Sequence, residues 1–186
     1  MRKLIFAINT TLDGCCDHTI FNPDEETLEY FTHLTQDADT FLYGRKTYQL
    51  MVPYWPDVAQ NPSGQTKADQ EFALAFDAID KIVVFSKSLD SPVDEKTRIV
   101  RTGLHDEVLK LKQQQGKNIL TGGVNIPSQL TAHGLIDEYH FVIHPIVAGA
   151  GRRLFEGINL KEKPELKLVE SRVFKSGCIA LRYLKQ

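Results

Sequence analysis

Short apolar runs alternate with amphipathic stretches along most of the chain. Leu4–Ile8 and Ile82–Phe85 are apolar at every position, as expected of central strands that are covered on both faces. Further strands are predicted at Thr40–Tyr43, Arg98–Arg101, Asn118–Thr121, Tyr139–Val147, Leu166–Phe174 and Cys178–Leu184. Lys175-Ser176-Gly177 joins the last two strands, which predicts a closing hairpin.

Helices are predicted between these strands. Asn22-Pro23-Asp24-Glu25 is a helix start, with Asn22 as the N-cap and Glu25 completing a capping box. Another helix begins at Gly44, and the remaining ones are predicted from Phe72-Ala75-Phe76-Ile79, Leu104-Val108-Leu111 up to Gly116, and Pro127–His133. Val52–Gly64 contains Pro53, Pro56, Pro62 and the only tryptophan, Trp55, and is predicted to be a long surface loop.

This alternation predicts an α/β fold. Strands that alternate with helices form a largely parallel sheet with helices on both faces, here a three-layer α/β/α sandwich with an antiparallel hairpin at its C-terminal edge. The 186 residues suit one domain, residues 1–186, and no composition break marks a linker.

Composition and charge argue against several classes of protein and of binding partner. Apolar residues make up 42% and charged residues 25% of the chain, and the net charge of −2 argues against a nucleic-acid partner. No apolar run approaches the ~20 residues of a membrane span, and Leu4–Ile8 is too short for a signal peptide. The three cysteines lack disulfide and metal-site spacings, so we expect a cytoplasmic protein with no metal centre.

The sequence Gly44-Arg45-Lys46-Thr47-Tyr48 carries the clearest candidate chemistry. It follows a buried strand and opens a helix, where free backbone N–H groups and the helix dipole favour an anion. Arg45 adds a planar fork, Lys46 a point charge and Thr47 a hydroxyl, all suited to phosphate. The alternative is a solvated basic helix start without a ligand.

Two further strand ends have matching features. Gly122-Gly123 allows close approach of a pyrophosphate or nicotinamide to bare backbone, although a ligand-free tight turn is the alternative. Ser86-Lys87-Ser88 combines hydroxyls with a cation suited to a ribose 2′-phosphate, or is merely a polar strand end. Since ligands bind outside the carboxyl ends of parallel strands, these loops and Gly44 are expected to face one crevice.

Other phosphate-binding motifs are excluded. Gly149-Ala150-Gly151 has Leu154 at the third glycine position of the dinucleotide fingerprint, and a phosphate loop ending at Gly44 would need its first glycine at Asp39. Candidate acids are Asp13 after the first strand and Asp24, Glu25 and Glu26 at the first helix start; their alternatives are turn formation and interaction with the helix dipole. Hydride transfer requires that the nicotinamide and the substrate be positioned against each other, and sometimes one proton donor. It does not require a protein nucleophile.

Taken in order, the motifs resemble the dihydrofolate reductase-like superfamily, and more closely the reductase domain of riboflavin-biosynthesis deaminase–reductases. The matching segments span nearly the whole chain: Thr11-Leu12-Asp13-Gly14, Gly44–Tyr48, Thr121-Gly122-Gly123, Gly134–Glu138, His144-Pro145 and Gly149–Phe155. The chain departs from dihydrofolate reductases at Gln49, where they usually carry Glu, and in the length of the loop around Trp55.

The resemblance implies an NADPH-dependent reductase acting on a small heterocyclic substrate, similar to 5-amino-6-(5-phosphoribosylamino)uracil, and a homodimer. It implies that the cofactor lies against Gly44, Arg45, Lys46, Thr47, Ser86, Lys87, Thr121, Gly122, Gly123 and Val124. It also implies substrate contacts at Asp13, Glu25, Trp55 and Gly151, with Asp13 orienting the substrate or relaying a proton. A non-catalytic nucleotide-binding homodimer and a dihydrofolate reductase proper are the alternatives.

Overall fold

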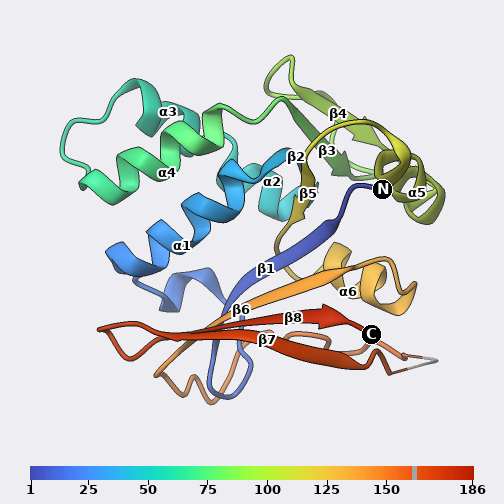
Figure 1. The fold of residues 1–186 in the computed structure, drawn as a ribbon. Helices are drawn as coiled ribbons and strands as arrows, with labels where there is room; N and C mark the ends of the chain where they lie inside the picture. The colour runs from blue at the N-terminus through green and yellow to red at the C-terminus, as the bar shows by residue number, and fades with distance from the viewer. Residues whose placement is uncertain (161–162) are drawn as a thin grey trace.

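One mixed sheet organises the protein. The computed structural model describes residues 1–160 and 163–186 and contains an 8-stranded sheet in the order β4-β3-β2-β5-β1-β6-β8-β7 (Figure 1). The strands are β1 (Leu4–Thr11), β2 (Ala38–Gly44), β3 (Lys81–Phe85), β4 (Thr97–Val100), β5 (Asn118–Thr121), β6 (Glu138–His144), β7 (Leu166–Val173) and β8 (Ile179–Lys185). β1 to β6 run parallel, whereas β8 is antiparallel to both β6 and β7, which confirms the predicted sheet and its closing hairpin.

Helices cover both faces of this sheet. Figure 1 shows α1 (Glu25–Gln36), α3 (Trp55–Gln60) and α4 (Lys67–Asp77) gathered on one side. The other face is covered by α5 (Leu104–Gln113) and α6 (Asn125–Ala132), while the short α2 (Arg45–Met51) follows β2. Side chains of β1 alternate between the layers: Leu4, Phe6 and Ile8 join a core with α5 and α6, and Ile5 and Ala7 join a core with α4. The three-layer α/β/α prediction is therefore confirmed.

Two helix boundaries differ from the predictions. The N-cap of α1 is Asp24 and not Asn22, because the Asp24 carboxylate accepts a hydrogen bond of 2.8 Å from the backbone N–H of Thr27. α5 ends at Gln113 with Gln114 as its C-cap. Gly116, predicted as the C′ residue, therefore lies one position beyond the observed C′. Boundary residues are the least certain part of any periodicity argument, because several neighbouring polar side chains can serve as caps.

The predicted surface loop Val52–Gly64 is wrong in its middle. Residues Trp55–Gln60 form α3, with Pro56 in the first turn, where a missing N–H costs no helical hydrogen bond. Val58 is buried, and the Trp55 indole packs edge-to-face on Phe72 of α4 at 4.5 Å between ring centroids. Tertiary packing against α4 therefore outweighs the turn-forming composition of this segment. None of the helices among the described residues is long and apolar enough to cross a membrane.

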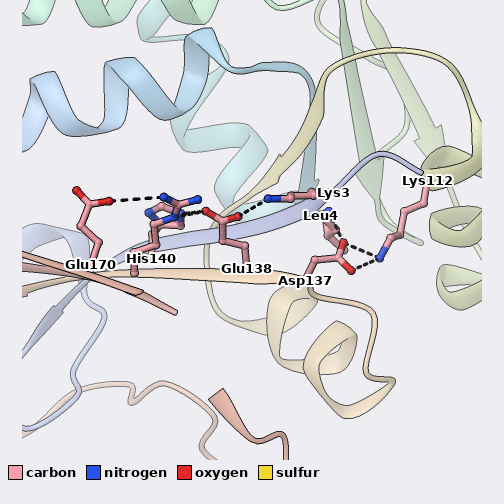
Figure 2. Close-up of polar contacts among 8 residues, drawn as sticks. Lys3, Leu4, Lys112, Asp137, Glu138, His140 and Glu170 are labelled. Carbon is pink, nitrogen blue, oxygen red and sulfur yellow. Dashed lines mark hydrogen bonds and ion pairs between the residues drawn. The ribbon is translucent and has the colours of Figure 1, made fainter. Parts of the chain in front are cut away.

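A ladder of alternating charges crosses four strands on the α1 face. It runs from Glu170 of β7 through Arg182 of β8 and Glu138 of β6 to Lys3 just before β1 (Figure 2). Arg182 Nε donates to Glu138 Oε1 at 2.6 Å, and His140 Nε2 donates to the same oxygen at 2.8 Å. His140 Nδ1 in turn accepts from the Tyr30 hydroxyl of α1 at 2.6 Å. The ladder thus fastens α1 and the antiparallel strands to the parallel sheet.

Glu138 is the most buried carboxylate of this ladder, with a side chain only 4% exposed. Burial raises its pKa, but the hydrogen bonds from His140 and Arg182 outweigh that effect and lower the pKa to about 2. A second ion pair lies beside it. The buried Lys112 of α5 donates to Asp137 and to the carbonyl of Leu135, and Asp137 accepts from the backbone N–H of Leu4 (Figure 2). These contacts join both helical layers to the start of β6.

Replacing Glu138 by Gln should destabilise the protein in a pH-dependent way. The pKa is depressed from 4.5 in the unfolded chain to about 2 in the folded one. The stabilisation is therefore fully present above pH 4.5, on the order of 3 kcal/mol, and is lost as the pH falls through 2. Urea unfolding of both proteins at pH 7, 4.5 and 2.5 measures it, and the difference between them should shrink at the lowest pH.

Glu170→Gln is the matched control, because it removes the outer carboxylate of the same ladder, which is 54% exposed. A surface ion pair contributes about 0–1 kcal/mol, so this variant should unfold almost like the wild type. If the two variants lose equal free energy of unfolding, or if the Glu138→Gln effect is independent of pH, the ionised Glu138 is not the stabilising group.

Candidate functional site

The turn between β2 and α2 brings the predicted phosphate-binding residues to the carboxyl edge of the sheet. Gly44 is the N-cap of α2 and makes no side-chain capping bond, so the first N–H groups of the helix lack an intrahelical or side-chain acceptor. Arg45 and Lys46 are exposed at this start. Arg45 Nη1 lies 3.5 Å from the Gln49 oxygen one turn later, which is the edge of hydrogen-bonding distance.

A second turn, between β5 and α6, packs directly against the first. Gly123 has φ +82°, and a Cβ added there would overlap the Thr47 hydroxyl oxygen. A Cβ added at Gly44 would come within 3.0 Å of Ile126 of α6. Only glycine meets both the positive φ and the close approach at position 123. The two turns therefore form one continuous surface.

Residues around this second turn have different surroundings. The Thr121 hydroxyl is buried and donates to the Leu42 carbonyl at 2.7 Å, so it links β5 to β2 beneath the turn. Gly122 lies against β1, since its added Cβ would be 3.4 Å from the Ala7 carbonyl oxygen. Val124 precedes α6 and packs partly into the core on that face. Gly122 and Gly123 are thus the residues that present bare backbone at the edge.

The end of β3 lies next to the first of these two turns, so that three turns adjoin along the carboxyl edge of the sheet. Phe85 pairs with Gly44, so Ser86 and Lys87 emerge beside the β2–α2 turn. The Ser86 hydroxyl oxygen accepts from the backbone N–H groups of Ser88 and Leu89, at 3.2 and 3.0 Å. Arg101, which the sequence did not single out, donates to the carbonyls of Lys87 and Leu89 at 3.1 Å each. The Lys87 side chain remains exposed on a turn whose backbone is held in place.

Asp13 holds together the loops that follow β1 and β6. Its carboxylate accepts from the Thr11 hydroxyl at 2.6 Å and from the backbone N–H groups of Ala148 and Gly149 at 3.0 and 2.9 Å. These bonds, that of Thr11 above all, lower its pKa to about 2. A carboxylate in this state has no proton to give at neutral pH. Asp13 therefore joins the two loops, and its predicted contact with substrate stays a prediction.

The other predicted substrate residues lie in different parts of the structure. Gly151 lies near Asp13, on the loop that pairs with the segment after β1, and its added Cβ would be 2.7 Å from Cys15 Sγ. Glu25 is exposed in the first turn of α1. Trp55 packs between Tyr54 and Phe72 in the α3–α4 layer, so its neighbours belong to that layer and not to the Asp13 loops. Its predicted contact with substrate stays a prediction.

A further cluster at the ends of β1, β6 and β8 was missed by the sequence reasoning. His144 Nε2 donates to Asn9 Oδ1 at 3.0 Å, and the Cys178 thiol donates to His144 Nδ1 at 3.3 Å. Burial lowers the pKa of His144, with the nearby Asp24 acting in the opposite direction. The three residues are far apart in the chain, and only the polar character of His144 on an apolar strand hinted at a special role.

Two hollows of the molecule lie away from this edge. A cavity of about 260 Å³ lies between α1 and the charge ladder, lined among others by Tyr30, Glu138 and His140. A shallower one of about 800 Å³ opens around Arg2 and Gln114. Both lie toward the amino ends of β1 and β6, whereas the glycine turns lie at the carboxyl ends. The candidate site is thus defined by its adjoining turns and not by either of these two hollows.

Comparisons with known proteins agree with this architecture. Residues 2–180 match the model of the RibD C-terminal domain family, and the chain belongs to that family. Among curated proteins, YyaP of Bacillus subtilis (strain 168) is 33% identical over 190 residues, covering 98% of this chain and 94% of YyaP. YwjB of the same organism is 29% identical over 176 residues, covering 89% and 90%. Both relatives are described as uncharacterised.

Solved structures share the fold at lower sequence identity. A putative riboflavin biosynthesis protein from Shewanella sp. PV-4 superimposes with a TM-score of 0.72 at 22% identity, covering 100% of this chain and 99% of that one. A deaminase/5-amino-6-(5-phosphoribosylamino)uracil reductase from Thermotoga maritima gives a TM-score of 0.66 at 16% identity, and this chain spans 57% of it. The resemblance predicted from the ordered motifs is thereby confirmed at the level of family and fold.

Replacing Gly123 by Ala should disrupt the contact between the two glycine turns. The variant combines an unfavourable positive φ with an overlap on Thr47, whereas Gly64→Ala has the nearly identical φ of +83° in open space. A left-handed non-glycine residue costs about 1–2 kcal/mol, so Gly64→Ala should lose that amount and Gly123→Ala clearly more. Urea unfolding measures both. Equal losses would show that Thr47 does not press on Gly123.

Replacing Asp13 by Ala should release the loop that contains Ala148 and Gly149. Hydrogen exchange at these two amides should accelerate at neutral pH, because their acceptor is gone. In the wild type the protection should be complete above pH 3.8 and decline as the pH falls through about 2, the depressed pKa of Asp13. Asp17→Ala is the control, since among the described residues the Asp17 carboxylate accepts hydrogen bonds from nearby Thr19 alone. Unchanged exchange in Asp13→Ala would contradict the role.

Proposed function

We propose that this protein is an NADPH-dependent reductase that delivers hydride to a small heterocyclic substrate of the ribosylaminopyrimidine type. The observation that carries the proposal is the row of three adjoining turns, Gly44–Thr47, Gly122–Gly123 and Ser86–Lys87, at the ends of neighbouring strands. Membership of the RibD C-terminal domain family and the reductase named among its structural neighbours support it.

The residues of this row fit the parts of a dinucleotide. Free N–H groups of α2 and the Arg45 and Lys46 cations suit the phosphates, and the bare backbone of Gly122 and Gly123 suits a flat ring or a pyrophosphate. Lys87, exposed on the turn anchored by Arg101, suits a ribose 2′-phosphate. When bound, NADPH supplies the hydride, while this chain orients both reactants at the edge.

A non-catalytic nucleotide-binding module is the second candidate. The observation that favours it is Asp13, whose carboxylate is engaged by the loop after β6 and held ionised, leaving no proton donor assigned. Consumption of NADPH with aminopyrimidine ribosides, dihydrofolate or simple carbonyls separates the candidates. Binding of NADPH without consumption in the whole panel would favour the module.

Lys87→Ala should weaken NADPH binding far more than NADH binding if Lys87 contacts the 2′-phosphate, because NADH lacks that group. Loss of a charge-assisted contact costs about 1.5–3 kcal/mol, or roughly 10- to 150-fold in affinity. Titration of both cofactors, followed by fluorescence, measures the ratio. Lys67→Ala is the control, because it removes an 88% exposed cation at the start of α4. Equal losses for both cofactors rule out the 2′-phosphate contact, and no binding of either at millimolar concentration rules out the cofactor.

We also propose a homodimer. β7 is an edge strand whose Leu168 and Val173 are 49% and 71% exposed, and an uncovered apolar edge is unfavourable in water. Sedimentation equilibrium of the wild type measures the mass directly. A monomeric mass at micromolar concentration would contradict the dimer.

A further inference from the structure

The cluster formed by Asn9, His144 and Cys178 lies beside the proposed cofactor turns. Thr11 of β1 pairs with His144 of β6, and the Gly122 turn approaches Ala7 on the other side of β1. Asn9 stands between these two points on β1. The glycine turn and the His144 residue therefore flank the same strand at the carboxyl edge of the sheet.

The His144 ring is held rigidly. It is buried at 3% exposure, and both of its ring nitrogens are engaged, one by Asn9 of β1 and one by the Cys178 thiol just before β8. Because Asn9 Oδ1 accepts from Nε2, the proton of the neutral imidazole is fixed on that nitrogen. The ring plane is thus set by two separate parts of the sheet.

The cover over this ring, by contrast, is held weakly. The phenyl ring of Phe21 lies 4.7 Å from the His144 ring, centroid to centroid, with an angle of 38° between the planes. Phe21 belongs to the exposed segment between β1 and α1, and in the described part of the chain residues 18–23 form hydrogen bonds only with Asp17. A segment with so few contacts opens at little cost.

We propose that the His144 imidazole is the platform on which a flat heteroaromatic ring of the substrate stacks, and that Phe21 competes with the substrate for that position. Asn9 adds an edge contact, since its carboxamide N–H groups donate to no described residue and suit a carbonyl oxygen or ring nitrogen of the ligand. The proposal rests on the proposed reductase function for the identity of the ring, but its test requires no turnover.

The test measures binding of 5,6-diaminouracil, used as the probe, to the full chain by titration of the imidazole NMR signals. Phe21→Ala should bind the probe about tenfold more tightly than the wild type, because the competing ring is gone. The signals of His144 should move, while those of His140 in the cavity near α1 should not. Ile20→Ala is the matched control, since Ile20 lies in the same segment and is 37% exposed.

His144→Gln keeps a donor toward Asn9 but lacks the ring, so it should abolish the gain when combined with Phe21→Ala. Equal affinities of the Phe21→Ala and Ile20→Ala variants, or shifts at His140 in place of His144, overturn the proposal. NADPH titration of the same samples keeps the two hypotheses apart. A protein that binds NADPH but shows no gain in Phe21→Ala contradicts only the platform, and one that shows the gain without binding NADPH contradicts only the cofactor.

Discussion

The placement of β6 is the constraint on which the rest of the structure depends. This strand is parallel to β1 on one side and antiparallel to β8 on the other, and the buried Glu138 at its start is paired with Arg182 and Lys3 from both sides. A shift of one residue would turn Glu138 and His140 toward the opposite, apolar core, and an unpaired buried carboxylate is very costly. The charge ladder therefore makes one register strongly favoured.

The register between β1 and β6 also determines which residues lie side by side at the carboxyl ends of these two strands. With Ile5 opposite Glu138, Thr11 comes to lie opposite His144, and the loops that follow the two strands leave side by side. Asp13 then joins these loops by accepting from Ala148 and Gly149. On the other side of β1, the glycine turns of β2 and β5 press on each other through Thr47 and Gly123. The proposed cofactor and substrate sides thus adjoin along one sheet edge.

Local signals predicted most of the elements, because each depends on neighbouring residues. Continuous apolar runs correctly indicated buried strands, and the glycine-containing turns lie at the predicted strand ends. The errors had two causes, competition between neighbouring caps and contacts with distant residues. Asp24 caps α1 in place of Asn22, and α3 forms in a proline-containing segment because Val58 and Trp55 find partners in the core beside α4.

The sequence by itself determined the alternation of strands and helices, the antiparallel hairpin, and the chemistry of the Gly44–Thr47 and Gly122–Gly123 turns. These follow from residue type and spacing, which act over a few positions. Three features were decided by the tertiary structure alone. The Asp13 carboxylate joins two loops, Arg101 donates to the turn after β3, and Asn9, His144 and Cys178 form one cluster. The physical reason is that hydrogen bonds between residues on different strands and loops, here 14 to 136 positions apart, depend on strand order and register, which no local pattern encodes.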